Sequence, residues 1–437
     1  MSWWRIFWDE GSHALRSVTV QKPSLIQLKP NSIMNPTRSV LSVTIALLLA
    51  SLTFLLSACS LPQVKAEDRL FQNIQLELLG EQIIPQGTVF KDTLIAGLSG
   101  LTYSPTDDTF YTVSDDRSDK APARFYQFKL ALDRAAKPTG IQFLKMVTLK
   151  NDQGEPFAPG TIDAEGIAIT PQGTVWVSSE GNAKRDIHPF VREFDLRTGK
   201  PLRNIYYPNH YVPQDVTQDV TPAKSDRKVG KGALRQGIQD NQGFESLTLS
   251  ANAARLSPLE PYRLFTATES DLEQDKLAED LEPTQGPSPR LMHYYVEKSR
   301  IDLIGEYLYP LEPRPMGSDN YGLVELLSLD GSGRFLALER SFGLTGFKIK
   351  LFQMVLAGAQ DTSALPIVKN LPKAVKSAQK ELLLDLQILD LTLDNLEGMT
   401  LGPRLPDGTQ SLIMISDDNF NALQKTQLLV FRIKGLK

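Results

Sequence analysis

A pattern of apolar and polar residues recurs five times between residues 97 and 418. Each copy has an apolar run that begins near a small or acidic residue, a turn, and a second apolar run that ends in an acid. The copies are Gly97–Tyr103 with Phe110–Asp116, Asp163–Ile169 with Val175–Glu180, Gly243–Leu249 with Leu264–Glu269, Leu323–Leu329 with Phe335–Glu339, and Asn395–Leu401 with Leu412–Asp418. Turn-forming residues such as Gly, Pro and Asp join the two runs, so each copy predicts a β-hairpin.

Several copies continue into a third run that alternates apolar and polar residues, namely Phe125–Leu130, Val191–Leu196, Phe347–Phe352 and Leu428–Ile433. Apolar inner strands followed by half-polar outer strands are typical of the blades of a β-propeller. The copies lie farther apart than the roughly 40 to 45 residues of a compact blade. Insertions at 186–242 and 270–289 explain part of the excess. Because an undetected blade can explain the rest, we expect six blades, with residues 70–90 supplying strands that close the ring.

A β-sandwich is the competing all-β architecture, since it also consists of short strands joined by turns. The recurring acids favour the propeller. In a ring of blades the same strand end of every repeat faces the central axis, so residues that recur there converge, whereas a sandwich would scatter them. We therefore predict an all-β propeller.

Acidic residues recur where the two strands of each hairpin meet, so paired antiparallel strands place them at one edge. They are Glu165, Glu245, Glu325 and Glu397 at first-strand starts, and Asp115, Asp116, Glu180, Glu269, Glu339, Asp417 and Asp418 at second-strand ends. Crowded carboxylates repel one another, and Ca²⁺, which binds six to eight oxygens, relieves that repulsion. The alternative is that these acids cap backbone N–H groups. The Asp-Asp pairs at 115–116 and 417–418 exceed what capping requires, so the set predicts a calcium site.

The composition narrows the class of protein. The 437 residues are 41% hydrophobic and 22% charged, as in ordinary globular proteins, and the net charge of −4 is unlike that of a basic nucleic-acid-binding protein. The single cysteine, Cys59, excludes an intramolecular disulfide, a thiolate-rich zinc site and a redox pair. We expect a monomer that does not bind nucleic acid.

An uncharged apolar run, Val40–Ala58, precedes Cys59 and has the length of a signal sequence or a membrane span. Its ending, Leu56–Cys59, resembles the lipobox of bacterial lipoproteins, in which the cysteine is acylated; a plain transmembrane anchor is the alternative. Either reading places the domain outside the cytoplasm, in a bacterial cell envelope on the periplasmic or extracellular side. We expect a leader at 1–58, whose real start is Met34, a lipid-anchored linker at 59–69 and a propeller domain at 70–437.

The repeat motifs resemble those of the phytase-like family, extracytoplasmic propellers described as having esterase-like activity and related in pattern to calcium-dependent β-propeller phytases. The matching motifs are Gly97–Leu101 with Val113–Arg117, Asp163–Gly166 with Trp176–Glu180, Asn241–Glu245, and Asn395–Gly398 with Ser416–Asn419. The resemblance covers nearly the whole chain after the leader. It implies a propeller, bound Ca²⁺ and a phosphate-ester or ester substrate at the axial face.

The resemblance also implies metal-assisted hydrolysis, in which carboxylates hold Ca²⁺ and basic groups neutralise developing charge. The implied metal ligands are Asp115, Asp116, Glu165, Glu180, Glu245, Glu397, Asp417 and Asp418, of which Glu165, Glu245, Glu397 and Asp417 are the expected catalytic residues. The expected phosphate-binding residues are Arg117, Arg124, Lys184 and Arg235, with Arg185 as a further candidate. The fourth repeat reads Leu-Val-Glu-Leu instead of Glu-Gly, which leaves Glu325 and Glu339 doubtful as ligands.

Two functions remain open at this point. The first is a calcium-dependent phosphoesterase or esterase at the cell envelope. The second is a non-catalytic propeller that binds a small ligand or an envelope partner, with the acids serving only as caps. Other chemistry has little support, since no Gly-x-Ser-x-Gly elbow occurs and His188, His210 and His293 lack the spacing of metal ligands.

Overall fold

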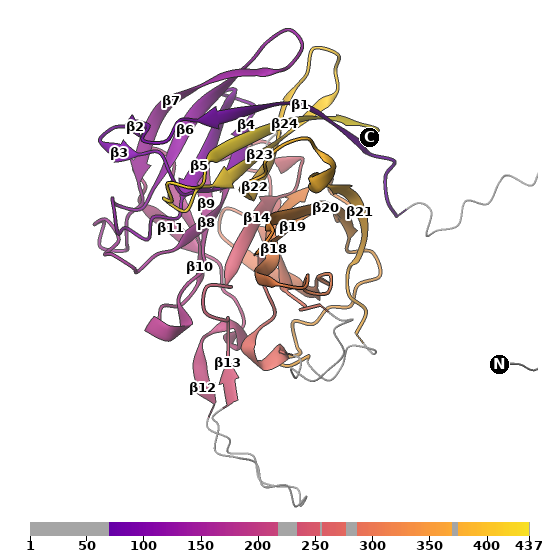
Figure 1. Cartoon of the computed structure of the whole chain (residues 1–437). Coiled ribbons are helices and arrows are strands. Elements are labelled where there is room, and N and C mark those ends of the chain that lie inside the picture. Colours follow the sequence, from indigo (N-terminus) through magenta and orange to yellow (C-terminus); the bar gives the residue numbers. More distant parts are fainter. Residues whose placement is uncertain (1–69, 217–233, 254–255, 277–285, 369–374, 437) are drawn as a thin grey trace, which may run out of the picture. The chain divides into compact units, whose positions relative to one another are not determined.

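Every sequence repeat folds into an antiparallel hairpin extended by further strands into a four-stranded sheet (Figure 1). The computed structural model describes residues 70–216, 234–253, 256–276, 286–368 and 375–436. The leader at 1–58, Cys59 and the linker at 59–69 lie outside these residues, so the lipoprotein prediction is not tested. Within the described part of the chain, no helix is long and apolar enough to cross a bilayer.

The first three blades follow one another along the chain. Blade 1 contains β4 (Leu98–Ser104), β5 (Thr109–Ser114), β6 (Arg124–Leu132) and β7 (Pro138–Thr148). Blade 2 contains β8 (Ala164–Ile169), β9 (Thr174–Ser179), β10 (Phe190–Asp195) and β11 (Pro201–Asn204). Blade 3 contains β14 (Phe244–Leu249), β15 (Tyr262–Thr268), β16 (Arg290–Val296) and β17 (Ile301–Leu308). In each blade the two inner strands are nearly all buried, which explains their continuous apolar runs.

The last two blades complete the ring. Blade 4 contains β18 (Ser318–Ser328), β19 (Arg334–Gly343), β20 (Gly346–Val355) and β21 (Gln379–Asp385). Blade 5 contains β22 (Asn395–Arg404), β23 (Gln410–Asp417), β24 (Thr426–Lys434) and β1 (Gln75–Ile84). Two short hairpins lie outside the blades, β2 (Val89–Phe90) with β3 (Thr93–Leu94), and β12 (Gln214–Val216) with β13 (Leu234–Gln236).

The described residues form five blades, and the sixth blade that we expected is not among them. Among the described residues the spacing between repeats comes from outer strands and insertions and not from a missed blade: residues 186–242 contain β10 and β11 of blade 2 and the β12–β13 hairpin, which pairs with no blade. The expectation that residues 70–90 close the ring is confirmed, because β1 pairs antiparallel with β24 from Gln75 opposite Lys434 to Ile84 opposite Thr426. The first and last strands of the domain therefore share one sheet.

The ring is held together by apolar residues between neighbouring blades. The first strands contact one another in the cyclic order β4, β8, β14, β18, β22 and back to β4. One apolar cluster lies at each junction; at the junction of blades 2 and 3, for example, Trp176 packs with Phe244 and Met292, all of which are inaccessible to solvent. Five such clusters between sheets that follow one another around a ring describe a propeller and exclude the sandwich.

The first strand of every blade contains a register shift at the same place. It falls between Leu98 and Leu101 in blade 1 and between Ala164 and Ile167 in blade 2. Blades 3, 4 and 5 repeat it in β14, β18 and β22. A β-bulge locally bends a strand and re-aims the side chain of the extra residue. This repeated bulge therefore decides which residue of each blade faces the centre of the ring.

The insertion loops of blade 3 converge on a buried arginine in β16. Arg290 donates to Asp275 at 2.8 Å and to Glu306 at 2.5 Å, and His210 lies 3.0 Å from the second oxygen of Glu306. These interactions tie the described residues around His210 and Asp275 to the third blade. His210 is accordingly a hydrogen-bonded loop residue and not a metal ligand.

Candidate functional site

Three positions in every blade bring side chains to one end of the central axis. In blades 1, 2, 3 and 5 the first immediately precedes the first strand or opens it, the second lies at the bulge, and the third follows or ends the second strand; in blade 4 the two inner strands are longer, so the corresponding positions lie inside them. The first and third are neighbours in the ladder: Asn395 pairs with Asp417 and Gly322 with Arg340, and the N–H of Glu180 donates to the carbonyl of Asp163. The bulge positions hold Ser99, Glu165, Glu245, Val324 and Glu397, and the third positions hold Asp115, Glu180, Glu269, Arg340 and Asp417.

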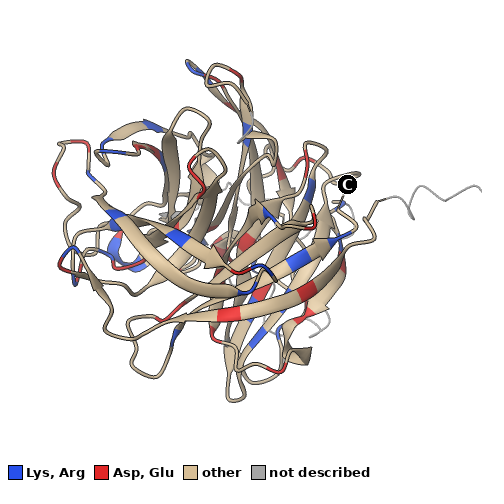
Figure 2. Cartoon of the chain, turned by 90° about the horizontal axis from the view of Figure 1, so that it is seen from above, with Lys and Arg blue, Asp and Glu red and all other residues tan. Residues whose placement is uncertain are grey.

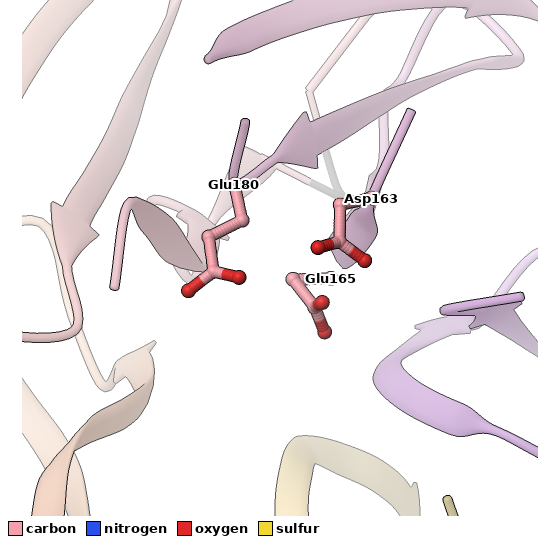
Figure 3. A group of neighbouring side chains, drawn as sticks. All are labelled: Asp163, Glu165 and Glu180. Carbon is pink, nitrogen blue, oxygen red and sulfur yellow. The ribbon is translucent and has the colours of Figure 1, made fainter. Parts of the chain in front are cut away.

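These positions define a carboxylate ring, a name used here for Asp115, Asp163, Glu165, Glu180, Glu245, Glu269, Glu397 and Asp417. Carboxylate oxygens of Asp163, Glu165 and Glu180 lie within 4.8 Å of one another (Figure 3). Oxygens of Glu165, Glu245 and Glu397, from three different blades, also lie within 4.8 Å of one another. Glu165 belongs to both groups, and Ser99 donates to it at 2.7 Å. The predicted convergence of acids from distant repeats is present in the structure.

Blade 4 is where the sequence alignment of the repeats was wrong by one residue. Its ladder pairs Leu323 with Glu339, which puts Val324 at the bulge position and Arg340 at the third position. Glu325 instead accepts backbone N–H groups from Leu247 and Leu326. Glu339 accepts from Tyr309 and Tyr321 and pairs with Lys380. Neither Glu325 nor Glu339 belongs to the carboxylate ring, in agreement with the doubt raised by their repeat.

Arg340 therefore stands where the other blades carry an acid. Its guanidinium is buried, and Nη2 donates to Glu397 at 2.8 Å and lies 3.4 Å from Glu269. A second guanidinium, that of Arg117, donates to Asp163 at 2.7 Å and to Asn241 at 2.5 Å. The blade architecture thus supplies internal cations to part of the ring.

Burial and mutual repulsion raise the pKa of the ring carboxyls. Burial, and after it the charge of Glu165, raise the pKa of Asp163 to about 8 even though Arg117 lowers it. Burial raises the pKa of Glu397 to about 7, with Arg340 acting against the shift. The pKa of Glu245 lies well above its usual range because of burial and then of four neighbouring glutamates. The two guanidinium groups therefore do not neutralise the ring, and further positive charge would be bound favourably.

All members of the carboxylate ring except Asp163 line the wall of a cavity of about 600 Å³. Two buried acceptors on this wall, Oδ1 of Asp115 and Oδ1 of Asn395, have no hydrogen-bond partner. Gly97 leaves room for the side chain of Asp115, because a Cβ at residue 97 would lie 2.1 Å from Oδ1 of Asp115. Unsatisfied oxygens beside repelling carboxylates are the donor set of a hard cation such as Ca²⁺.

Two of the predicted ligands have other partners. Asp116 pairs with buried Arg124 at 2.5 Å and accepts the N–H groups of Lys120 and Ala121. Asp418 accepts the N–H groups of Gly97 and Phe420 and the hydroxyl of Thr426. The second acid of each Asp-Asp pair therefore caps backbone N–H groups, as the alternative interpretation of the acids expected. Only the first acid of each pair, Asp115 or Asp417, faces the cavity. Arg124, held by Asp116, does not line the cavity either.

The remaining basic candidates lie away from the carboxylate ring. Lys184 is largely exposed and pairs with Asp240 at 2.5 Å. Lys184 and Arg235 line a separate pocket with Glu273. Arg185 lies beside Gly160. Of the predicted phosphate-binding residues, Arg117 alone lines the cavity among the residues that the structure describes.

Sequence reasoning missed Asp163, Glu269, Asn395 and Arg340 as site residues. Glu269 was recognised as a blade-end acid, but its place beside Arg340 was not. The signal for Asp163 and Asn395 was their position at the start of the first strand, opposite the recurring acid: Asp163 precedes β8 and Asn395 opens β22. Arg340 could not be found in this way, because a repeat is recognised by the residues that its copies share and blade 4 has an arginine where the other copies have an acid.

Five blades around a carboxylate-lined cavity define a β-propeller with an acidic axial site. The profile of the family described as "Phytase-like: Esterase-like activity of phytase" matches residues 93–420. The chain therefore belongs to the phytase-like family. Acidic and basic residues elsewhere on the blades are interspersed (Figure 2).

Individual proteins show more distant similarity. Over 143 residues the chain is 32% identical to an "Uncharacterized secreted protein" of Arthroderma benhamiae, a match that covers 31% of this chain and 27% of that protein. The chain thus spans about a quarter of that relative's length. Among solved structures, the allergen Mala s 1 of Malassezia sympodialis shares 11% identity, with 80% of this chain and 82% of that chain covered and a TM-score of 0.35. The Dos1 propeller shares 7% identity over 78% of this chain and 69% of that chain, with a TM-score of 0.30.

Proposed function

We propose that this protein is a calcium-dependent phosphoesterase whose active site is the carboxylate ring. The observation that carries the proposal is the position of Glu165, whose carboxylate is shared by two groups of acids that come together from three blades. Membership in a family described by esterase-like activity supports a hydrolytic function. The raised pKa values of Asp163 and Glu397 support a site that is balanced by bound cations.

The residues present fit calcium by their chemistry. Each acid triad offers only oxygen ligands, and both triads are buried. Asp163, Glu165 and Glu180 would hold one ion, and Glu165, Glu245 and Glu397 would hold or share a second. The unpartnered oxygens of Asp115 and Asn395 are further donors on the same wall. Bound Ca²⁺ would supply Lewis-acid polarisation of a phosphoryl oxygen and of a water molecule.

The protein's own groups have two tasks in this proposal. Arg117 and Arg340 line the cavity and place guanidinium N–H groups near the carboxylates, where they can also bind the oxygens of a phosphoryl group. Asp417 lines the same cavity and belongs to neither acid triad, so its carboxylate, when ionised, can accept a proton from an attacking water. Burial raises the pKa of Asp417 well above its usual range, which makes the ionised group a stronger base. Glu165, Glu245 and Glu397, which the sequence analysis expected to be both metal ligands and catalytic residues, are metal ligands only in this proposal.

The test is hydrolysis of 4-nitrophenyl phosphate by the purified protein, with calcium and with excess chelator. We expect turnover only with calcium, and a loss of at least about tenfold in kcat/KM for Glu165→Gln, since even residues behind a metal's ligands contribute that much. Glu381→Gln, an exposed acid on β21, is the matched control and should keep full activity. Activity that survives the chelator would reject the proposal.

A second candidate is a non-catalytic propeller that binds a small ligand or an envelope partner. The observation in its favour is that Asp116 and Asp418 serve as caps and that Arg340 already balances Glu269 and Glu397. This candidate predicts a folded protein without turnover on any ester and without stabilisation by calcium.

We also propose that the chain is exported and anchored by a lipid on Cys59. The apolar run Val40–Ala58 followed by that cysteine supports this proposal, as does the name of the Arthroderma benhamiae relative, which describes that protein as secreted. Cys59→Ala should move the protein from the membrane fraction to the soluble fraction of the cell envelope. An unchanged distribution would favour a plain transmembrane anchor.

A further inference from the structure

The cavity has an apolar side as well as an acidic one. Four apolar residues of blades 4 and 5, here named the apolar wall, line it: Phe342, Phe347, Leu393 and Leu423. Phe342 and Phe347 face each other across the β19–β20 hairpin, with ring centroids 4.7 Å apart. Phe342 is 43% exposed and Leu423 is 94% exposed. Apolar side chains held at the mouth of a polar cavity offer surface to the apolar part of a ligand.

The charges that line the same cavity limit the number of anionic groups that a single bound ligand can carry. Among the described residues that line it, the basic side chains are Arg117 and Arg340. Arg117 is engaged with Asp163, and Arg340 with Glu397 and Glu269. A ligand with many phosphate groups needs several basic partners beyond the bound metal, and the carboxylate ring repels every phosphate that no cation neutralises.

We propose that this site hydrolyses a phosphate monoester of an apolar alcohol, such as an aryl or long alkyl ester, and not a polyphosphorylated sugar or polyol. The inference rests on the proposed function and names its substrate class. The phosphoryl group lies at the carboxylate ring, and the apolar group packs on Phe342, Phe347 and Leu423. In the reaction the oxygen of water bonds to phosphorus, the bond between phosphorus and the alcohol oxygen breaks, and the alcohol leaves with a proton from that water, giving inorganic phosphate.

The decisive experiment measures binding of phosphonates that cannot be hydrolysed, by calorimetry on the full chain with saturating calcium. Benzylphosphonate and methylphosphonate carry the same anionic group and differ in apolar surface. We expect benzylphosphonate to bind about tenfold tighter, as burial of part of a phenyl ring predicts. Leu423→Ser should remove most of that difference. Leu344→Ser is the matched control, because Leu344 is 96% exposed and does not line the cavity.

Equal affinity for the two phosphonates, or a preference that Leu423→Ser leaves intact, would overturn the proposal. Tighter binding of inositol hexakisphosphate than of benzylphosphonate would overturn it as well. Failure of the proposed function has a different signature, namely no calcium-dependent hydrolysis of any phosphate ester. A protein that hydrolyses 4-nitrophenyl phosphate only with calcium but shows no dependence on Leu423 retains the function and loses the inference.

Discussion

Arg340 is the residue at which the five repeats differ most in chemistry. It occupies the position that is acidic in the other four blades, and its guanidinium contacts two of their carboxylates. The neighbouring charges of Glu397 and Glu269 raise the pKa of Arg340 even though burial opposes this, so it stays charged. One residue thus provides a permanent counter-ion in a site that, under the proposed function, would otherwise depend on bound cations.

Removing this arginine leaves buried carboxylates without their partner. Arg340→Met should lower the free energy of unfolding in chelator by about 3–5 kcal/mol, the usual cost of breaking a buried ion pair from one side. Calcium should restore part of that loss. Thermal unfolding with chelator and with calcium measures both effects. Arg300→Met, which removes a largely exposed arginine, is the control and should change little. An Arg340→Met protein as stable as the wild type in chelator would contradict this role.

At the scale of single elements, the bulge in β8 needs a small neighbour. Gly166 follows the bulged Glu165, and a Cβ there would lie 2.6 Å from Cβ of Leu247, 2.7 Å from Oγ of Ser178 and 2.9 Å from the carbonyl oxygen of Glu245. The contacts with Leu247 and Glu245 come from the next blade. The glycine therefore permits the close approach of blades 2 and 3, which brings Glu165 near Glu245.

A methyl group at this position should push the two blades apart. Gly166→Ala is expected to cost about 1–3 kcal/mol of stability, as other insertions into packed interiors do, and to weaken calcium binding. The control is Gly140→Ala in β7, where an added Cβ meets nothing within 4 Å. Denaturant unfolding and a calcium titration of both variants measure the two effects. If Gly166→Ala matched Gly140→Ala in both, blade packing would not position the site.

The elements were more predictable than their register. Hairpins, third strands and closure by the N-terminal strand follow from alternation and turn residues, which act locally. The site was predictable only where the repeats agree, as at Glu165, Glu245 and Glu397. Blade 4 was misaligned because Glu325 follows the bulge instead of occupying it, and a shift of one residue turns a side chain away. The capping roles of Asp116 and Asp418 depend on tertiary contacts that adjacent acids in a sequence do not reveal.

At the scale of the whole molecule, the proposed metal binding would link the protonation of the ring to the stability of the fold. The pKa of Asp163 rises from 3.8 to about 8 and that of Glu397 from 4.5 to about 7. A carboxyl whose pKa is raised by folding contributes stability that is present below its unfolded pKa and is lost as the pH rises through its folded pKa. Without metal, the fold should therefore weaken as the pH rises from about 4, near the unfolded pKa values, to about 8, the highest of the folded ones, because these carboxyls ionise against burial and repulsion.

Calcium should reverse this dependence, because it binds the ionised carboxylates and competes with their protons. The melting temperature in chelator is expected to fall across this pH interval, and the stabilisation by calcium is expected to grow. Melting curves at several pH values, with calcium and with chelator, measure both trends. If the melting temperature depended on pH in the same way with calcium and with chelator, protonation of the ring would not be linked to calcium binding.

The most direct measurement of the central claim is a calorimetric titration of calcium into protein stripped of metal by a chelator. The account predicts saturable binding near neutral pH, an affinity at least about tenfold weaker in Glu165→Gln, since that change removes a direct ligand, and unchanged binding in Glu381→Gln. Absence of saturable binding, or equal affinity in the wild type and in Glu165→Gln, would contradict the claim that acids from separate blades form one calcium site.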